Sequence, residues 1–76
     1  QFSLYPNPAV DLITIKCNSN QDTANSVYAV YDEFGKMLKQ GKLGDGILNV
    51  SALNPGDYSL LIKSSERNEY LRFIKM

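Results

Sequence analysis

Apolar and polar residues alternate along this chain with a period of two, and this spacing constrains the fold more than any other feature. The alternation is regular across residues 13–17, and in the run 58–62 the apolar residues Tyr58, Leu60 and Ile62 share one face. No stretch carries apolar residues at the i, i+3, i+4, i+7 spacing of an amphipathic helix over three turns. The pattern therefore predicts β-strands and no substantial helix.

Short runs rich in Val, Ile, Leu and Tyr are separated by clusters of Gly, Pro, Asn and Asp, which favour turns. The runs cover 2–5, 10–17, 26–32, 36–40, 47–50, 58–64 and 70–75. Strands at this spacing predict an antiparallel β-sandwich of immunoglobulin-like type, with about seven short strands. A small open barrel is the alternative that the pattern leaves open.

Two of the connections have specific turn chemistry. Pro6 and Pro8, on either side of Asn7, lack N–H donors and have fixed φ angles, so they predict a rigid extended corner. Gly35 can adopt the left-handed conformation that closes a hairpin turn, and Lys36 begins the returning strand.

A third corner and one long polar stretch complete the connections. The corner is centred on a Pro-Gly pair that ends at Gly56, and Tyr58 follows it in phase with the apolar face of the next strand. Tyr58 is therefore expected in the core. Residues 18–25 are polar except for one alanine and predict an exposed loop.

The size and charge of the chain exclude several classes of function. Seventy-six residues with 43% apolar content predict one domain over 1–76, and the start at Gln1 suggests a fragment of a larger protein or a processed piece. The formal net charge is zero, so no basic field is available for nucleic acid. The longest apolar runs, such as 60–62, are too short to cross a bilayer.

The composition also argues against catalysis and against metal or cofactor binding. The chain has no histidine and one cysteine, so Cys17 has no imidazole partner and cannot complete a zinc site. Cys17 is expected near the core as a small apolar residue. Four of the five aspartates fall at strand ends or turns, where Asp accepts local backbone hydrogen bonds. They are Asp11, Asp32, Asp45 and Asp57.

Five tyrosines leave a binding function open. An exposed, coplanar row of tyrosines could stack on sugar rings, and would indicate a carbohydrate-binding or fibronectin-like spacer module. Tyrosine is also common on half-buried strands, where its ring lies inside and its hydroxyl at the rim. Tyr28 and Tyr31 are expected on opposite faces of their strand, so one of them is expected to lie outside the core.

An ordered set of motifs points to a particular family. Leu-Tyr-Pro-Asn-Pro-Ala stands at 4–9, Tyr-Asp-x-x-Gly-Lys at 31–36, Gly-x-Tyr at 56–58 and Arg-Phe-Ile-Lys at 72–75. In this order, the motifs resemble the type A C-terminal sorting domain of the type IX secretion system (the Por secretion system) of Bacteroidetes. The resemblance extends from residue 4 to residue 75.

The resemblance implies that the domain is a sorting signal and not an enzyme. Members of the family direct a cargo protein across the outer membrane after it has folded in the periplasm, and the cargo is then secreted or displayed at the cell surface. The implied partners are the type IX translocon and a sortase-like surface peptidase that removes the domain. The cleavage site is expected upstream of the sandwich, or within residues 1–4.

The run 70–75 is expected to form a terminal strand at a sheet edge, where main-chain groups are open to another chain. From the residues alone, ordinary protection of that edge by charged side chains is the favoured interpretation. The resemblance makes the run the predicted recognition element. We expect Arg72, Phe73 and Lys75 to contribute to recognition by the translocon, with Phe73 anchoring the strand. Open edge strands also allow a weak homodimer.

Overall fold

The computed structural model describes residues 2–17, 25–65 and 67–76, and these residues form seven β-strands. In chain order the strands are β1 (Phe2–Tyr5), β2 (Leu12–Cys17), β3 (Val27–Tyr31), β4 (Met37–Lys42), β5 (Ile47–Asn49), β6 (Gly56–Lys63) and β7 (Asn68–Lys75). The described part of the chain contains no helix long and apolar enough to cross a membrane.

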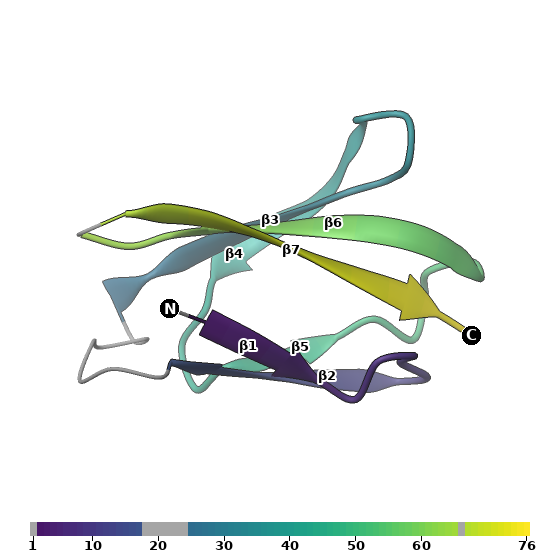
Figure 1. The fold of residues 1–76 in the computed structure, drawn as a ribbon, viewed down its shortest axis with the longest axis horizontal. Helices are drawn as coiled ribbons and strands as arrows, with labels where there is room; N and C mark the ends of the chain where they lie inside the picture. Colours follow the sequence, from purple (N-terminus) through teal and green to yellow (C-terminus); the bar gives the residue numbers. More distant parts are fainter. Residues whose placement is uncertain (1, 18–24, 66) are drawn as a thin grey trace.

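The strands form two sheets that face each other (Figure 1). One sheet has three strands in the order β1-β2-β5, and the other has four in the order β4-β3-β6-β7. Every pair of neighbouring strands within the sheets is antiparallel. The predicted all-β, immunoglobulin-like sandwich is therefore confirmed.

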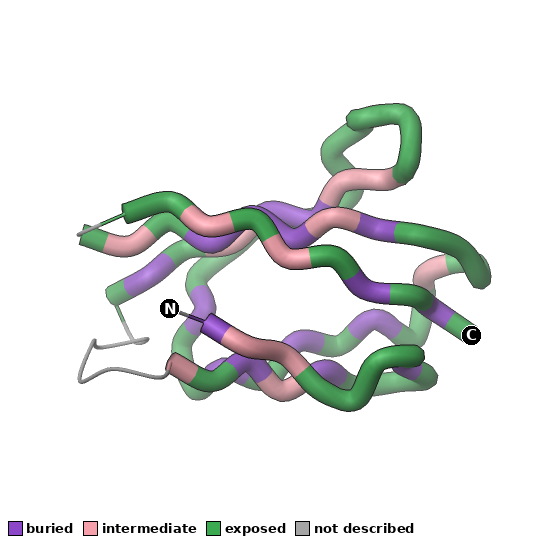
Figure 2. The backbone as a smooth tube through the Cα atoms, viewed as in Figure 1, coloured by how far each residue is buried: buried purple, intermediate pink, exposed green. Residues whose placement is uncertain are grey.

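The core lies between the two sheets, and the buried residues in Figure 2 gather on the strands where the sheets face each other. The alternation that predicted the strands also selects the buried side chains. Tyr58 is 8% exposed while Leu60 and Ile62 are fully buried, and Ile13 and Ile15 fill the opposite sheet. Tyr58 was predicted in the core, and its position confirms that prediction.

Strand boundaries differ from the sequence-based ranges where pairing partners decide them. β2 begins at Leu12, two residues later than predicted, because Leu12 is the first residue paired with β5. β6 begins at Gly56, two residues earlier than predicted, because Gly56 is paired with Lys75 of β7. Most of the predicted polar loop, 18–24, lies outside the described residues.

One glycine in the connection between β4 and β5 extends the pairing of β2 with β5 within the three-stranded sheet. Gly46 has a φ of 82°, and its carbonyl accepts a 2.6 Å hydrogen bond from the N–H of Ile15 in the three-stranded sheet. A Cβ atom at Gly46 would lie 2.5 Å from the carbonyl oxygen of Ile15. Both the backbone conformation and this close approach require glycine here.

Candidate functional site

Strand β7 lies at one edge of the four-stranded sheet and pairs along its whole length with β6 (Figure 1). The pairing runs from Asn68 opposite Lys63 to Lys75 opposite Gly56. Because successive side chains of a strand point to opposite faces, β7 presents two different surfaces. One faces the core and the other faces outward.

The core face of β7 is anchored by an aromatic pair. Phe73 is 1% exposed, and its ring stacks on that of Tyr58 with 5.5 Å between the centroids and 19° between the planes. The hydroxyl of Tyr58 donates a 2.5 Å hydrogen bond to the carbonyl of Asn54 at the start of the corner. The stack therefore connects β7 to β6 and to the corner that precedes β6.

The three residues predicted to contact the translocon have different surroundings. Arg72 is exposed on the outer face of β7, whereas Phe73 is in the core. Lys75 is only 7% exposed, and its ammonium group donates a 2.9 Å hydrogen bond to the carbonyl of Met76. Of the three side chains, Arg72 alone is displayed to a partner in the folded domain.

The outer edge of β7 is covered at one end by the proline-rich corner, which we call the latch (residues 7–9). The N–H of Ala9 donates to the carbonyl of Ile74 (2.7 Å), and the N–H of Met76 donates to the carbonyl of Ala9 (2.9 Å). The side-chain Oδ1 of Asn7 accepts from the N–H of Ile74 (2.9 Å). β7 therefore lies at a sheet edge as expected, but the latch pairs with one end of that edge, so the edge is not open along its whole length.

The latch also explains why an asparagine lies between two prolines. Pro6 and Pro8 follow cis peptide bonds and have no N–H to offer a neighbouring strand. The side chain of Asn7 supplies polar groups in their place, accepting from Ile74 and lying with Nδ2 3.5 Å from the carbonyl of Arg72. The sequence predicted the rigid corner but gave no signal that it pairs with a strand 65 residues away.

The remaining part of the β7 edge is open. Along an antiparallel strand, the N–H and C=O groups of successive residues point alternately to one neighbouring strand and to the other. The N–H and C=O of Ile74 point away from β6 and bond to the latch. The outward set therefore also includes Asn68, Tyr70 and Arg72. In the described part of the chain, no main-chain group outside β6 bonds to the main chain of residues 68–71. The contact from β1 is to a side chain, where the N–H of Phe2 donates to the carboxylate of Glu69 at 3.2 Å.

A shallow hollow of about 440 Å³ lies beside this open edge, on the outer face of the sheet. Tyr31, Ser59, Tyr70 and Arg72 line it together with acidic side chains from neighbouring connections. No group of three or more potential metal ligands occurs within the described ranges. The hollow has a polar rim of hydroxyl groups, carboxylates and the Arg72 guanidinium.

Two of the aspartates have the turn role that was predicted for them. Oδ1 of Asp32 accepts from the N–H groups of Phe34 and Lys36, both at 2.9 Å, and Oδ1 of Asp45 accepts from the N–H of Ile47. Gly35, inside the first of these turns, has a φ of 85° as the hairpin prediction required.

The tyrosines do not form a single row. Tyr28 packs against the core and Tyr31 lies on the outer face, as predicted. Burial raises the pKa of the Tyr28 hydroxyl. Tyr70 shares the outer face with Tyr31, while Tyr5 is exposed on the three-stranded sheet.

Comparison with known proteins gives a family and a fold. The family model described as "Secretion system C-terminal sorting domain" matches residues 3–76. A solved structure of PorZ, described as an essential bacterial surface component of the type IX secretion system of Porphyromonas gingivalis, matches with a TM-score of 0.74 and 19% identity. That match covers 99% of this chain and 11% of the PorZ chain, and supports the fold alone. No curated protein matches.

Proposed function

Because the chain belongs to the family of secretion system C-terminal sorting domains, we propose that the secretion machinery recognises it through the open edge of β7. A domain of this family is a sorting signal for type IX secretion, and it directs a cargo protein to the cell surface or to secretion. The carbohydrate-binding and spacer alternative is not favoured by this membership.

The observation that carries the proposal is the contrast between the two halves of one edge. The latch occupies the outward main-chain groups near Ile74, whereas in the described residues those of Tyr70 form no main-chain hydrogen bond with a neighbouring segment. An extended segment of a receptor can add to such an edge by main-chain hydrogen bonds, which do not depend on the identity of the cargo. Arg72 adds a positive charge that selects among partners.

Phe73 and Lys75 contribute to recognition indirectly in this scheme. Phe73, stacked on Tyr58, holds the strand in register, and the stem of Lys75 packs at the rim of the core. Their role is to keep the edge rigid, which lowers the entropy cost of docking a partner strand.

The family membership also supports a proposal for the steps before and after recognition. We infer that the domain folds in the periplasm before translocation and is then removed by a sortase-like surface peptidase, so it acts as a substrate and not as an enzyme. The outer edges of β4 and β7 also allow a weak homodimer by strand pairing.

The experiment fuses the chain to a periplasmic reporter in a host with a type IX system and scores arrival at the cell surface. Tyr70→Pro removes one outward N–H from the open edge, where proline is tolerated, without removing a bond to β6. Tyr70→Ala removes the same side chain and keeps the N–H. We expect surface arrival to fall about tenfold for Tyr70→Pro and to persist for Tyr70→Ala.

Two charge-reversal variants test the role of Arg72. Arg72→Glu should reduce surface arrival, whereas Arg67→Glu, an exposed charge in the connection before β7, should not. All four variants must first give the same far-ultraviolet circular dichroism spectrum as the parent chain. Full surface arrival of both Tyr70→Pro and Arg72→Glu would rule out recognition through this edge.

A further inference from the structure

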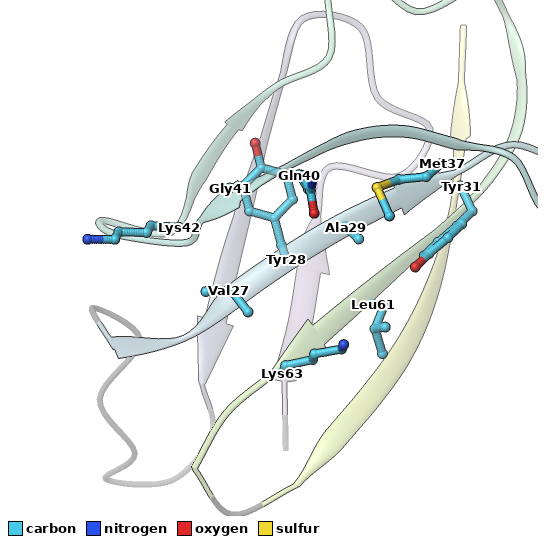
Figure 3. Close-up of a pocket in the computed structure, with 10 residues that line it drawn as sticks. All are labelled: Val27, Tyr28, Ala29, Tyr31, Met37, Gln40, Gly41, Lys42, Leu61 and Lys63. Atoms are coloured by element: carbon cyan, nitrogen blue, oxygen red, sulfur yellow. The ribbon is translucent and has the colours of Figure 1, made fainter.

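The outer face of the four-stranded sheet carries an apolar trough (Val27, Ala29, Tyr31, Met37 and Leu61) that is separate from the edge of β7. Figure 3 shows these side chains converging from three strands. Ala29 and Leu61 form the floor and are only 8% and 5% exposed, although no second sheet lies over this face. The trough has a volume of about 360 Å³, which is within the range of binding pockets.

One end of the trough is positively charged. Lys42 of β4 and Lys63 of β6 flank Val27 there, as Figure 3 shows. No carboxylate is among the residues that line the trough, and neither lysine forms an ion pair within the described ranges. The trough therefore favours an apolar group that has a negative charge beside it.

The same molecule displays such a group at the turn between β3 and β4, which we call the tip (residues 32–35). Phe34 is 87% exposed there, the largest exposed fraction among the big apolar side chains of the described residues. The acidic Glu33 precedes it and is also exposed. In Figure 1 the turn projects from the body of the sandwich at the upper right.

The tip is preorganised by its own hydrogen bonds. The N–H groups of Phe34 and Lys36 both donate to the side-chain Oδ1 of Asp32. The N–H of Gly35 donates to the main-chain carbonyl of Asp32 at 3.1 Å. A rigid tip loses little conformational entropy when its aromatic side chain is inserted into a pocket.

The tip cannot fill the lysine end of the trough in its own copy. Val27 and Tyr31 lie at opposite ends of β3, about 13 Å apart at the usual rise of a strand, and the tip continues beyond Tyr31. The acidic tip and the basic end of the trough are therefore at opposite ends of the hairpin. A formal net charge of zero adds no overall repulsion between copies.

We propose that the chain associates head to tail with a second copy of itself, with Phe34 of one copy in the trough of the next and Glu33 beside Lys42 and Lys63. This contact joins two different surfaces, so each dimer retains one free tip and one free trough and can extend. A single inserted side chain buries less than the roughly 1,200 Å² of a stable interface, so the association is weak, with a dissociation constant of about 0.1–1 mM.

The test follows sedimentation and amide chemical shifts of the 76-residue chain as its concentration is raised to about 1 mM under reducing conditions. The parent chain should form dimers and longer species, and added salt should weaken them. Phe34→Ser should weaken association by about tenfold, and so should the double variant Lys42→Glu with Lys63→Glu. Val10→Ser, which also removes an exposed apolar side chain, is the matched control.

A mixing experiment separates this contact from pairing of edge strands. Phe34→Ser retains an intact trough and the double lysine variant retains an intact tip, so a mixture of the two should form a 1:1 dimer that does not extend. A parent chain that stays monomeric at about 1 mM would overturn the proposal. So would Phe34→Ser associating like the parent, or a mixture that stays monomeric while the parent associates.

Discussion

At the scale of single residues, two glycines with positive φ are expected to differ sharply in their tolerance of a side chain. Gly35 has a φ of 85° with open space around it, whereas Gly46 has a φ of 82° and lies against the backbone of Ile15. Gly35→Ala should cost about 1 kcal/mol of unfolding free energy, from the backbone conformation alone. Gly46→Ala should cost about 3 kcal/mol or more, because the backbone of β2 must also move.

Denaturant unfolding of the two variants measures this difference, with the slope of the free energy against denaturant as a check on the two-state assumption. Equal losses at the two positions would mean that the close approach between Gly46 and Ile15 contributes nothing. Both substitutions add the same methyl group to a glycine with a left-handed backbone conformation. The difference between their losses of stability therefore measures the cost of the close contact between Gly46 and Ile15.

Tyr28 gives the residue-scale prediction for pH. Burial raises the pKa of its hydroxyl in the folded chain above the value of 10.0 expected when unfolded. The stability linked to this group is therefore fully present below pH 10.0 and is lost as the pH rises through the folded pKa. Tyr28→Phe should not show this loss.

The measurement is the difference in unfolding free energy between the parent and Tyr28→Phe from neutral to strongly alkaline pH. This difference should be constant below about pH 9. Above pH 10.0 the parent should lose stability relative to Tyr28→Phe. A constant difference across the whole range would show that burial does not perturb the hydroxyl.

At the scale of elements, the latch determines how much of the β7 edge is accessible. Asn7→Ala removes the acceptor for the N–H of Ile74 and leaves the main-chain bonds of Ala9 in place. We expect a loss of about 1 kcal/mol in stability and faster hydrogen exchange at the amide of Ile74. The amide of Phe73, directed toward β6, should change much less.

Asn68→Ala is the control, since Asn68 is an exposed asparagine at the other end of β7. Its substitution should leave the exchange of Ile74 unchanged. If Asn7→Ala also leaves that exchange unchanged, the latch is held by the main chain of Ala9 and not by the asparagine.

At the scale of the whole molecule, a small sandwich has one thin core, so one large side chain contributes a large part of its stability. Phe73→Ala should cost about 3–5 kcal/mol, because it removes a ring that is 1% exposed and stacked on Tyr58. Phe34→Ala should change stability by less than about 0.5 kcal/mol, since Phe34 is 87% exposed.

Thermal unfolding of these two variants compares the same substitution inside and outside the core. Phe73→Ala should lower the midpoint by at least about 12 °C, given about 4–8 °C per kcal/mol for a domain of this size. If Phe73→Ala unfolds at the same temperature as the parent chain, packing of β7 does not stabilise the sandwich. In that case its edge cannot be a rigid docking site.

The sequence alone determined what depends on neighbouring residues. The period of two determined that the chain forms strands, and the glycine and proline clusters determined where it turns. The motifs at 4–9, 31–36, 56–58 and 72–75 also identified the family, because their order along the chain is itself sequence information.

Only the tertiary structure decided which distant groups meet. The pairing of Asn7 with Ile74 joins residues 67 positions apart, and no local propensity encodes such a contact. Leu61 is buried although it lies on the face opposite Leu60 and Ile62, and Lys75 is buried although it is charged. Burial of this kind depends on the twist of the sheet and on the side chains of neighbouring strands. The alternation of residues within a single strand carries no information about either.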